Sequence, residues 1–456
     1  MKKLTKRTKP AYYEYPPASS LLQKASLREI LRKHKIRLPQ RETVTKSFIR
    51  IIISLFKAVS SSETNRQLIR HVAFTYISTS EQLKQCITHL SKQSEIAIDL
   101  EFDKNRYRYG FNLCLMQIYI DDACYLIDPL SSELEISDIF PLLENPEITK
   151  VAFSFGEDIR LLHHIGCIPK GIYDLSFAIA LLDYPPTSLT NHLKDIVGVE
   201  VGKSSQQSNW FNRPLSQDQL EYAASDVLYL FELRDALVLQ LKEKKIEDWV
   251  KQENEAFESA DYSNENHNEI LKEKYKNGLN QVGWYVFSAL MMYRDNQAEK
   301  MNRPPFHIID RGYLKELASN PDAIKSWNSK SSIHKSLRKE SIKNEIDNLI
   351  REKLKEAKSL GLSQRKKATT RLSKEEYEAY KGMQQKVSEA KAHVFKPIQK
   401  EMESRYGKHA RAFILSNRTI AELVEGDFSN YLPYKQQLIE GLAEKLDLPL
   451  SDYVQS

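Results

Sequence analysis

Apolar residues divide residues 75–250 into short strands and amphipathic helices. The stretches 95–101, 112–120 and 123–128 are apolar runs bounded by polar residues, which is typical of buried strands. They follow a predicted helix and are not separated by helices themselves, which favours an antiparallel meander. Later strand–helix units add parallel pairing, and the region ends in helices. The pattern therefore predicts an α/β domain with a mixed sheet.

The first predicted strand contains two acidic residues, Asp99 and Glu101, in the segment IAIDLEFD. Side chains two residues apart on a strand point to the same face, so these carboxylates should be neighbours. Two ionised carboxylates at that separation repel each other unless a cation lies between them. The pair is thus a candidate metal site, although a solvated strand end would carry the same residues.

Two further segments contribute acidic residues from predicted helices. Asp158 lies in the first turn of a helix expected over 155–164, where an acidic side chain could also simply complement the helix dipole. Tyr222 and Asp226 lie four residues apart in the amphipathic stretch 217–241, so they share one helical face, as an ordinary surface pair also would. Each segment alone is ordinary, and their combination is what indicates a site.

These segments resemble the three motifs of the DEDD exonucleases, in the subclass that has tyrosine in the third motif. KVAFSFGEDIRLL, GIYDLSFAIALL and SNWFNRPLSQDQLEYAASDVLYL are also similar to the ribonuclease D family, over about residues 75–250. The resemblance implies a ribonuclease H-like fold and a metal-dependent 3′→5′ exoribonuclease that releases nucleoside 5′-monophosphates. It further implies single-stranded RNA 3′ ends as substrates, in particular transfer-RNA precursors.

The resemblance also implies a role for each acidic residue. Asp99 would bridge two divalent metal ions, Glu101 and Asp226 would bind one of them, and Asp158 would reach the other through water. Carboxylate oxygens suit Mg²⁺ or Mn²⁺ and not zinc. Tyr222 would contact the attacking water, and its ordinary pKa of about 10 favours an orienting role over that of a general base. The expected catalytic set is Asp99, Glu101, Asp158, Tyr222 and Asp226.

Four other residues are candidates for binding the substrate strand. Lys203, Trp210 and Arg213 lie in the polar loop VGKSSQQSNWFNRPLS before the third motif. A cation can contact phosphate, and an indole can either stack on a base or pack under the loop. Gln117 lies on a predicted central strand, at a position that resembles one near the family's active site.

Charge is distributed unevenly along the 456 residues, whose net charge is +6. Residues 1–70 carry 17 Lys and Arg against 4 Asp and Glu, and residues 330–411 carry 22 against 11. Residues 71–329 have a net charge of −14. Basic flanks beside a nuclease-like region are expected to contact phosphates, although lysine-rich segments are often only solvated surfaces.

Helical patterning resumes after a polar gap at 259–269. The segment from Trp284 to Pro321 resembles an HRDC domain, a small helical nucleic-acid-binding module, and a degenerate second copy follows. The expected organisation is a basic extension at 1–74, the exonuclease domain at 75–258, an HRDC domain at 271–357 and a second HRDC-like domain at 372–456.

Other features restrict the alternatives. The sequence has no apolar run long enough to cross a bilayer, no signal-peptide pattern and no phosphate-binding loop of the helicase type. Its four cysteines form no C-x-x-C pair, which predicts buried free thiols and a cytoplasmic location. No membrane or protein partner is expected. A DNA-directed 3′→5′ exonuclease of repair and a non-catalytic RNA-binding scaffold stay as alternative functions.

Overall fold

The computed structural model describes residues 74–121, 123–202, 205–262, 270–365, 374–426, 428 and 431–454. Residues 1–73 of the predicted basic extension at 1–74, and the predicted phosphate ligand Lys203, lie outside these ranges. Within them, no helix has both the length and the hydropathy needed to cross a membrane. All four cysteines are buried free thiols, as predicted.

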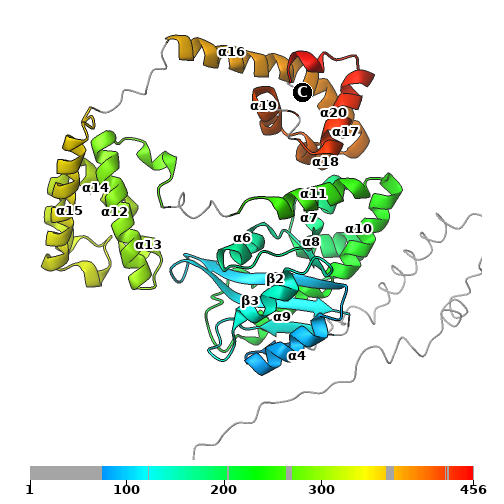
Figure 1. Ribbon diagram of the computed structural model, residues 1–456, viewed down its shortest axis with the longest axis horizontal. Coiled ribbons are helices and arrows are strands. Elements are labelled where there is room, and N and C mark those ends of the chain that lie inside the picture. Colours follow the sequence, from blue (N-terminus) through cyan, green and yellow to red (C-terminus); the bar gives the residue numbers. More distant parts are fainter. Residues whose placement is uncertain are drawn as a thin grey trace, which may run out of the picture.

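A six-stranded mixed sheet forms the centre of the first domain (Figure 1). Its strands in spatial order are β1 (Phe74–Ile77), β4 (Ala123–Ile127), β3 (Phe111–Ile120), β2 (Glu95–Lys104), β5 (Thr149–Ala152) and β6 (Ile172–Asp174). Strands β2, β3 and β4 form the predicted antiparallel meander. The pairs β1–β4, β2–β5 and β5–β6 are parallel, which confirms the mixed sheet. Strand β1 was not predicted, because its four residues are too few to show a period.

Helices cover both faces of the sheet. The helices of this domain are α4 (Ser80–Leu90), α5 (Phe140–Leu143), α6 (Gly156–His164), α7 (Leu175–Leu181), α8 (Leu189–His192), α9 (Gln217–Leu228), α10 (Leu230–Lys244) and α11 (Glu247–Ser259). On one face, Ile96, Ile98 and Leu100 of β2 form a core with α4 and α6. On the other, Ala97 of the same strand joins a core with α7, α9 and α10. Alternation along β2 thus separates the two layers.

The stretch 217–241, predicted as one helix, is two. Helix α9 ends at Leu228 and α10 begins at Leu230, with Tyr229 between them at φ −113° and ψ 11°. Both helices bury apolar side chains against the same core, so the sequence shows a continuous amphipathic period across the break.

Two helical modules follow the first domain. The first helical module, residues 270–365, contains α12 (Gln281–Lys300), α13 (Pro305–Ile308), α14 (Arg311–Ser319) and α15 (Glu340–Ser359). The C-terminal module, residues 374–454, contains α16 (Lys374–Ala390), α17 (Lys396–Tyr406), α18 (Lys408–Ile414), α19 (Asn417–Glu425) and α20 (Pro433–Lys445).

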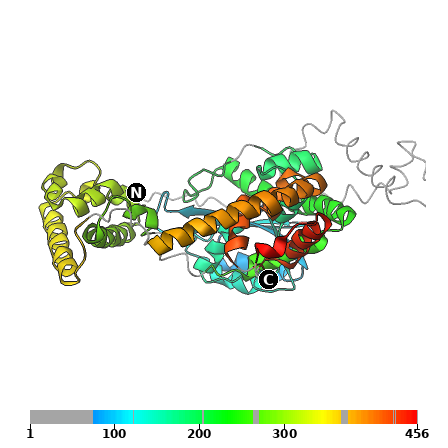
Figure 2. The same ribbon diagram turned by 90° about the horizontal axis from the view of Figure 1, so that it is seen from above.

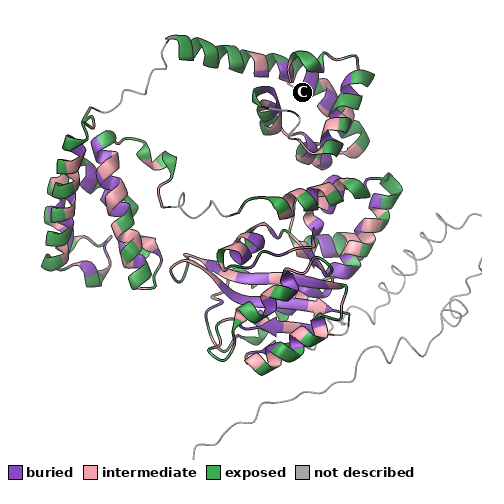
Figure 3. Cartoon of the chain, viewed as in Figure 1, coloured by how far each residue is buried: buried purple, intermediate pink, exposed green. Residues whose placement is uncertain are grey.

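The modules differ in how they are buried. The first has a core of its own, which includes Phe287 and Trp327. The C-terminal module covers the helices of the first domain (Figures 1 and 2), and its residues Phe395 and Tyr434 belong to the same core as Ala97. Much of α16 is exposed (Figure 3).

Candidate active site

Strand β2 carries Asp99 and Glu101 on the face that α9 covers. Their neighbours Ile98 and Leu100 point into the opposite core, so the period of two puts both carboxylates on one side of the sheet. Directly after Glu101 the register with β3 shifts, because Glu101 pairs with Leu115 and Phe102 with Leu113. This bulge ends regular pairing next to the acidic pair.

Asp158 lies in the first turn of α6 and is buried. Its position depends on the turn between β5 and α6, where Ser154 has a φ of 55°. The carboxylate of Asp174 accepts hydrogen bonds from the backbone N–H groups of Ser154 at 2.9 Å and Phe155 at 2.8 Å. Asp174 in turn donates its own N–H to the side-chain oxygen of Asn254 on α11, at 2.7 Å. Asp174 and Asn254 were not predicted, because their contacts join segments far apart in the sequence.

Helix α9 supplies Tyr222 and Asp226. The helix begins at a capping box, in which Ser216 and Gln219 exchange side-chain to backbone hydrogen bonds. This cap fixes the start of the helix six residues before Tyr222. Carboxylate oxygens of Asp99, Glu101 and Asp226 lie within 4.8 Å of one another. Side chains from β2 and α9, more than 120 residues apart in the sequence, therefore form one acidic cluster.

A pocket of about 740 Å³ opens over this cluster. It is lined by all five predicted catalytic residues, Asp99, Glu101, Asp158, Tyr222 and Asp226. Its other polar lining residues include Glu157, Gln206, Gln207 and one arginine, Arg106. Arg106 lies in the turn between β2 and β3 and was not among the predicted site residues. The signal available was RYRYG, an alternation of cationic and aromatic residues at a predicted hairpin turn.

The carboxylates of the pocket destabilise each other when ionised. Burial raises the pKa of Asp99 to about 7. Burial, followed by the charges of Asp99, Asp226 and Asp158, raises the pKa of Glu101 well above its usual range. Burial and the charge of Asp99 raise the pKa values of Asp158 and Asp226 in the same way. A bound cation would remove this repulsion, and an all-oxygen donor set suits Mg²⁺ or Mn²⁺, so the acidic cluster can hold such a metal.

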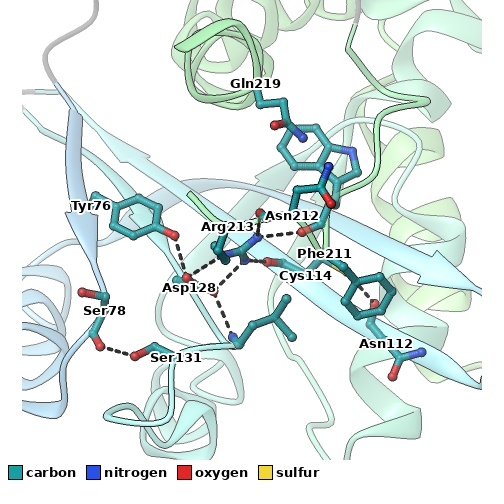
Figure 4. Close-up of polar contacts among 12 residues, drawn as sticks. Tyr76, Ser78, Asn112, Cys114, Asp128, Ser131, Phe211, Asn212, Arg213 and Gln219 are labelled. Carbon is teal, nitrogen blue, oxygen red and sulfur yellow. Dashed lines mark hydrogen bonds and ion pairs between the residues drawn. The ribbon is translucent and has the colours of Figure 1, made fainter. Parts of the chain in front are cut away.

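Arg213 has a structural role and does not contact the pocket, contrary to the expectation that it binds phosphate. Its guanidinium forms a two-point ion pair with Asp128 at the end of β4, at 2.7 and 2.6 Å (Figure 4). It also donates to the carbonyl oxygens of Trp210, Asn212 and Cys114. All five guanidinium donors are thereby used, and none is left for a phosphate. Cys114 is the residue skipped by the bulge, so Arg213 satisfies a carbonyl at the position where the ladder is interrupted.

The other two described candidates are buried. Trp210 is 2% exposed and packs beside Tyr222, with ring centroids 6.2 Å apart, so of its two possible roles the structure shows packing under the loop. Gln117 is fully buried opposite Asp99 in the β2–β3 register, and neither polar atom of its side chain has a hydrogen-bond partner among the described residues. Complete burial excludes direct contact between Gln117 and a substrate in this conformation.

Comparisons with known proteins agree with this geometry. Residues 74–242 match the family model for a 3′–5′ exonuclease. Ribonuclease D from Desulfotalea psychrophila is 31% identical over 248 residues, which are 53% of this chain and 66% of that protein. Ribonuclease D from Zymomonas mobilis is 30% identical over 249 residues, or 54% of this chain and 63% of that protein.

The fold extends beyond the aligned sequence. The crystal structure of Escherichia coli RNase D, an exoribonuclease involved in structured RNA processing, has a TM-score of 0.59 with this chain at 17% identity. The match covers 82% of this chain and 99% of that structure, so the helical region is included in the shared fold. The sequence alignments span just under two thirds of the curated relatives' own length. The chain therefore contains a 3′–5′ exonuclease domain and is a distant homologue of ribonuclease D across about half of its length.

Proposed function

We propose that this protein is a metal-dependent 3′→5′ exoribonuclease that trims RNA 3′ ends and releases nucleoside 5′-monophosphates. The observation that carries the proposal is the pocket in which Asp99, Glu101, Asp158 and Asp226 meet Tyr222. Grouping four largely buried carboxylates costs folding free energy, and such clusters are typical of functional sites, which argues against a non-catalytic scaffold.

The four carboxylates would hold two divalent ions, Mg²⁺ or Mn²⁺. When bound, such ions acidify a water molecule and stabilise charge on the attacking and leaving oxygens. The residues of the chain fix where this happens. Asp99 and Glu101 are held by the sheet, Asp226 by α9, and Asp158 by the turn that Asp174 organises. Rigid elements of this kind keep ligands in one geometry.

Tyr222 would orient the attacking water. Its ring lies beside the buried indole of Trp210, which restricts the directions in which the hydroxyl can point. Asp226 is one helical turn away, so the hydroxyl and a metal-binding carboxylate face the same pocket. Positioning of the nucleophile is a recognised source of rate enhancement, and here it requires no change in the protonation of Tyr222.

The substrate proposed is single-stranded RNA with a free 3′ end, with transfer-RNA precursors as the biological example. Two features support a polyanionic substrate: the curated relatives are ribonucleases D, and the regions flanking the acidic middle are basic. The helical modules at 271–357 and 372–456 are proposed as HRDC-type nucleic-acid-binding domains.

The decisive experiment compares wild type with Asp99→Asn on a labelled RNA in Mg²⁺. We expect the substitution to reduce hydrolysis by at least about 100-fold, because it removes a charged ligand of both proposed ions, while RNA binding is largely retained. Asp138→Asn, at an exposed position away from the pocket, is the matched control and should hydrolyse RNA normally. Normal turnover by Asp99→Asn would contradict the assignment.

Substrate choice is tested separately with matched RNA and DNA oligonucleotides. Each is offered with a free or a blocked 3′ end, in Mg²⁺ or in chelator. The proposal expects hydrolysis of RNA with a free 3′ end in Mg²⁺ alone. Faster hydrolysis of DNA would favour a repair exonuclease, and hydrolysis in chelator would rule out the metal-dependent reaction.

A further inference from the structure

The lining of the pocket is strongly acidic, and it includes one more acidic side chain than the four proposed metal ligands. Five acidic side chains line it, because Glu157 adds to Asp99, Glu101, Asp158 and Asp226. A phosphodiester chain that approaches this pocket meets charge of its own sign. Among the described residues that line the pocket, Arg106 is the single lysine or arginine. Its guanidinium forms no ion pair with any carboxylate of the described chain and lies over the ring of Tyr107, 5.2 Å from the centroid.

Arg106 belongs to a hairpin tip, residues 105–110, that is fixed before any ligand binds. The buried carboxylate of Asp103 accepts three hydrogen bonds from the tip, from the backbone N–H groups of Arg106 at 3.3 Å, Tyr107 at 3.1 Å and Arg108 at 3.2 Å. The side chain of Asn105 accepts a fourth from Gly110, at 2.9 Å. A carboxylate that binds several backbone N–H groups holds a turn in one conformation.

The side chains of the tip are displayed outward even though its backbone is fixed. Arg106, Tyr107 and Arg108 are all exposed, and Tyr107 is exposed by 37%. The hydroxyl of Tyr107 donates to the carbonyl oxygen of Gln207 at 3.4 Å, and Gln207 is itself a lining residue of the pocket. Tyr107 therefore lies at the pocket rim, beside the arginine that enters the lining.

The far side of the tip is attached to the first helical module. The hydroxyl of Tyr109 donates to the carboxylate of Asp295 at 2.6 Å, and the N–H of Tyr109 donates to the side-chain oxygen of Asn302 at 3.3 Å. The tip is thus held by hydrogen bonds to Asp103 within its own domain and by hydrogen bonds of Tyr109 to the module. Preorganisation of this kind reduces the entropy lost when a flexible ligand binds.

We propose that the hairpin tip 105–110 is the binding site for the single-stranded segment of substrate that leads into the pocket. Arg106 pairs with a backbone phosphate, and the ring of Tyr107 stacks on a base. Alternating cationic and aromatic side chains are suited to single-stranded nucleic acid, because every base has a π face and every linkage has a charge. This inference rests on the proposed function, since it names the residues that deliver the strand to that site.

Steady-state hydrolysis of a labelled RNA in Mg²⁺ tests the proposal with Arg106→Ala and Tyr107→Leu. We expect KM to rise by about tenfold in each, with kcat within about twofold of wild type, because binding is lost upstream of the reacting bond. Tyr107→Phe keeps the ring but loses the hydrogen bond to Gln207, so its KM should lie between those of wild type and Tyr107→Leu. Lys84→Ala removes an exposed cation from α4, within the same domain, and should change neither parameter.

A second readout separates this inference from the proposed function. Anisotropy of a fluorescent RNA in chelator measures binding without hydrolysis. Arg106→Ala should reduce the slope of log affinity against log salt by about 1, whereas Tyr107→Leu should weaken binding without changing the slope. Unchanged KM, affinity and slope in both variants, with normal thermal unfolding, would overturn the inference. If wild-type protein hydrolysed no RNA, the proposed function would fail, and the anisotropy measurements would still decide whether the tip binds RNA.

Discussion

The two helical modules are attached to the exonuclease domain in different ways. The C-terminal module continues the core of that domain. Tyr434 of α20 stacks on Trp249 of α11 with ring centroids 4.9 Å apart, and Lys435 forms a nearly buried ion pair with Glu253 at 2.7 Å. At the start of α18, the carboxylate of Asp183 accepts a hydrogen bond from the N–H of His409 at 2.6 Å.

The first helical module has its own core, against which Tyr109 is the single side chain that packs from the described part of the exonuclease domain. Among the residues that the structure describes, Tyr109 makes two hydrogen bonds to this module, one with Asp295 and one with Asn302. Apolar burial contributes far more to stability than one or two exposed hydrogen bonds. The C-terminal module therefore shares the core of the exonuclease domain, whereas the first helical module has a separate core and makes few contacts with that domain.

This difference affects how the helical region should be studied. A deletion of residues 270–456 would remove any contribution of both modules to RNA binding. It would also expose the apolar faces of α7 and α11, so loss of activity would not separate binding from folding. The modules have to be tested one at a time.

The largest expected effect is that of truncation after residue 365, which removes the C-terminal module alone. Because that module completes the core, we expect the remaining protein to lose cooperative unfolding, or to aggregate. Circular dichroism during thermal unfolding provides the measurement. A truncated protein that keeps the melting temperature of full-length protein would mean that the two modules do not differ in the way described.

Lys435→Ala should come next in size. The substitution leaves Glu253 without its cationic partner in a nearly dry environment, which typically costs about 3–5 kcal/mol of unfolding free energy. Urea unfolding, followed by near-ultraviolet signals from the exonuclease domain, should show the loss. Lys445→Ala, on the same helix, breaks an exposed pair with Glu401 and should cost below about 1 kcal/mol. Equal losses in both variants would argue against a shared core.

Acid should weaken the exonuclease domain by protonating Asp128. Burial acts to raise the pKa of Asp128, but hydrogen bonds from Arg213 and Tyr76 outweigh it and hold that pKa below its ordinary value. The ionised form thus stabilises the folded state above the unfolded-state pKa of about 4, and this stabilisation is lost as the pH falls through the lower folded pKa. Asp128→Asn should be less stable than wild type at pH 7, with a difference that shrinks toward pH 3. A constant difference would exclude this carboxylate as the cause.

Tyr109→Phe should have the smallest effect on stability, below about 1 kcal/mol, because it removes a single hydroxyl. The expected change is in geometry. Fluorescence energy transfer between dyes on α10 and α15 should give a broader distance distribution than in wild type. Tyr285→Phe, which removes a comparable hydrogen bond to Glu356 inside the module, should leave the distribution unchanged. A distribution unaffected by Tyr109→Phe would mean that other contacts hold the module.

Relations between residues close in the sequence could be predicted, whereas contacts between distant segments could not. Periodicity was sufficient to put Asp99 and Glu101 on one face of a strand and Tyr222 and Asp226 on one face of a helix, because these relations are local. The mixed sheet followed from the order of strands and helices. The break at Tyr229 could not be predicted, since both helices share one apolar face.

Contacts between distant segments explain the residues that were misjudged. Arg213 has the charge expected of a phosphate ligand, but its guanidinium is paired with Asp128. That pairing could not be predicted, because Asp128 lies 85 residues earlier in the sequence. Arg106 was missed for the opposite reason. Its segment RYRYG shows an alternation of cationic and aromatic residues, but the sequence does not show that the fold brings Arg106 into the acidic pocket.

Two adjacent residues of α11 have a consequence for protein engineering. Glu253 faces α20, where it binds Lys435, and Asn254 faces the sheet, where it binds Asp174 beneath the turn that leads to Asp158. A chimaera that exchanges the C-terminal module for that of a relative would alter the partners of one residue and could shift the other through their common peptide bond. Such chimaeras should therefore exchange α11 together with the module. The junction then falls in α10 and not beside Asp158, a proposed metal ligand.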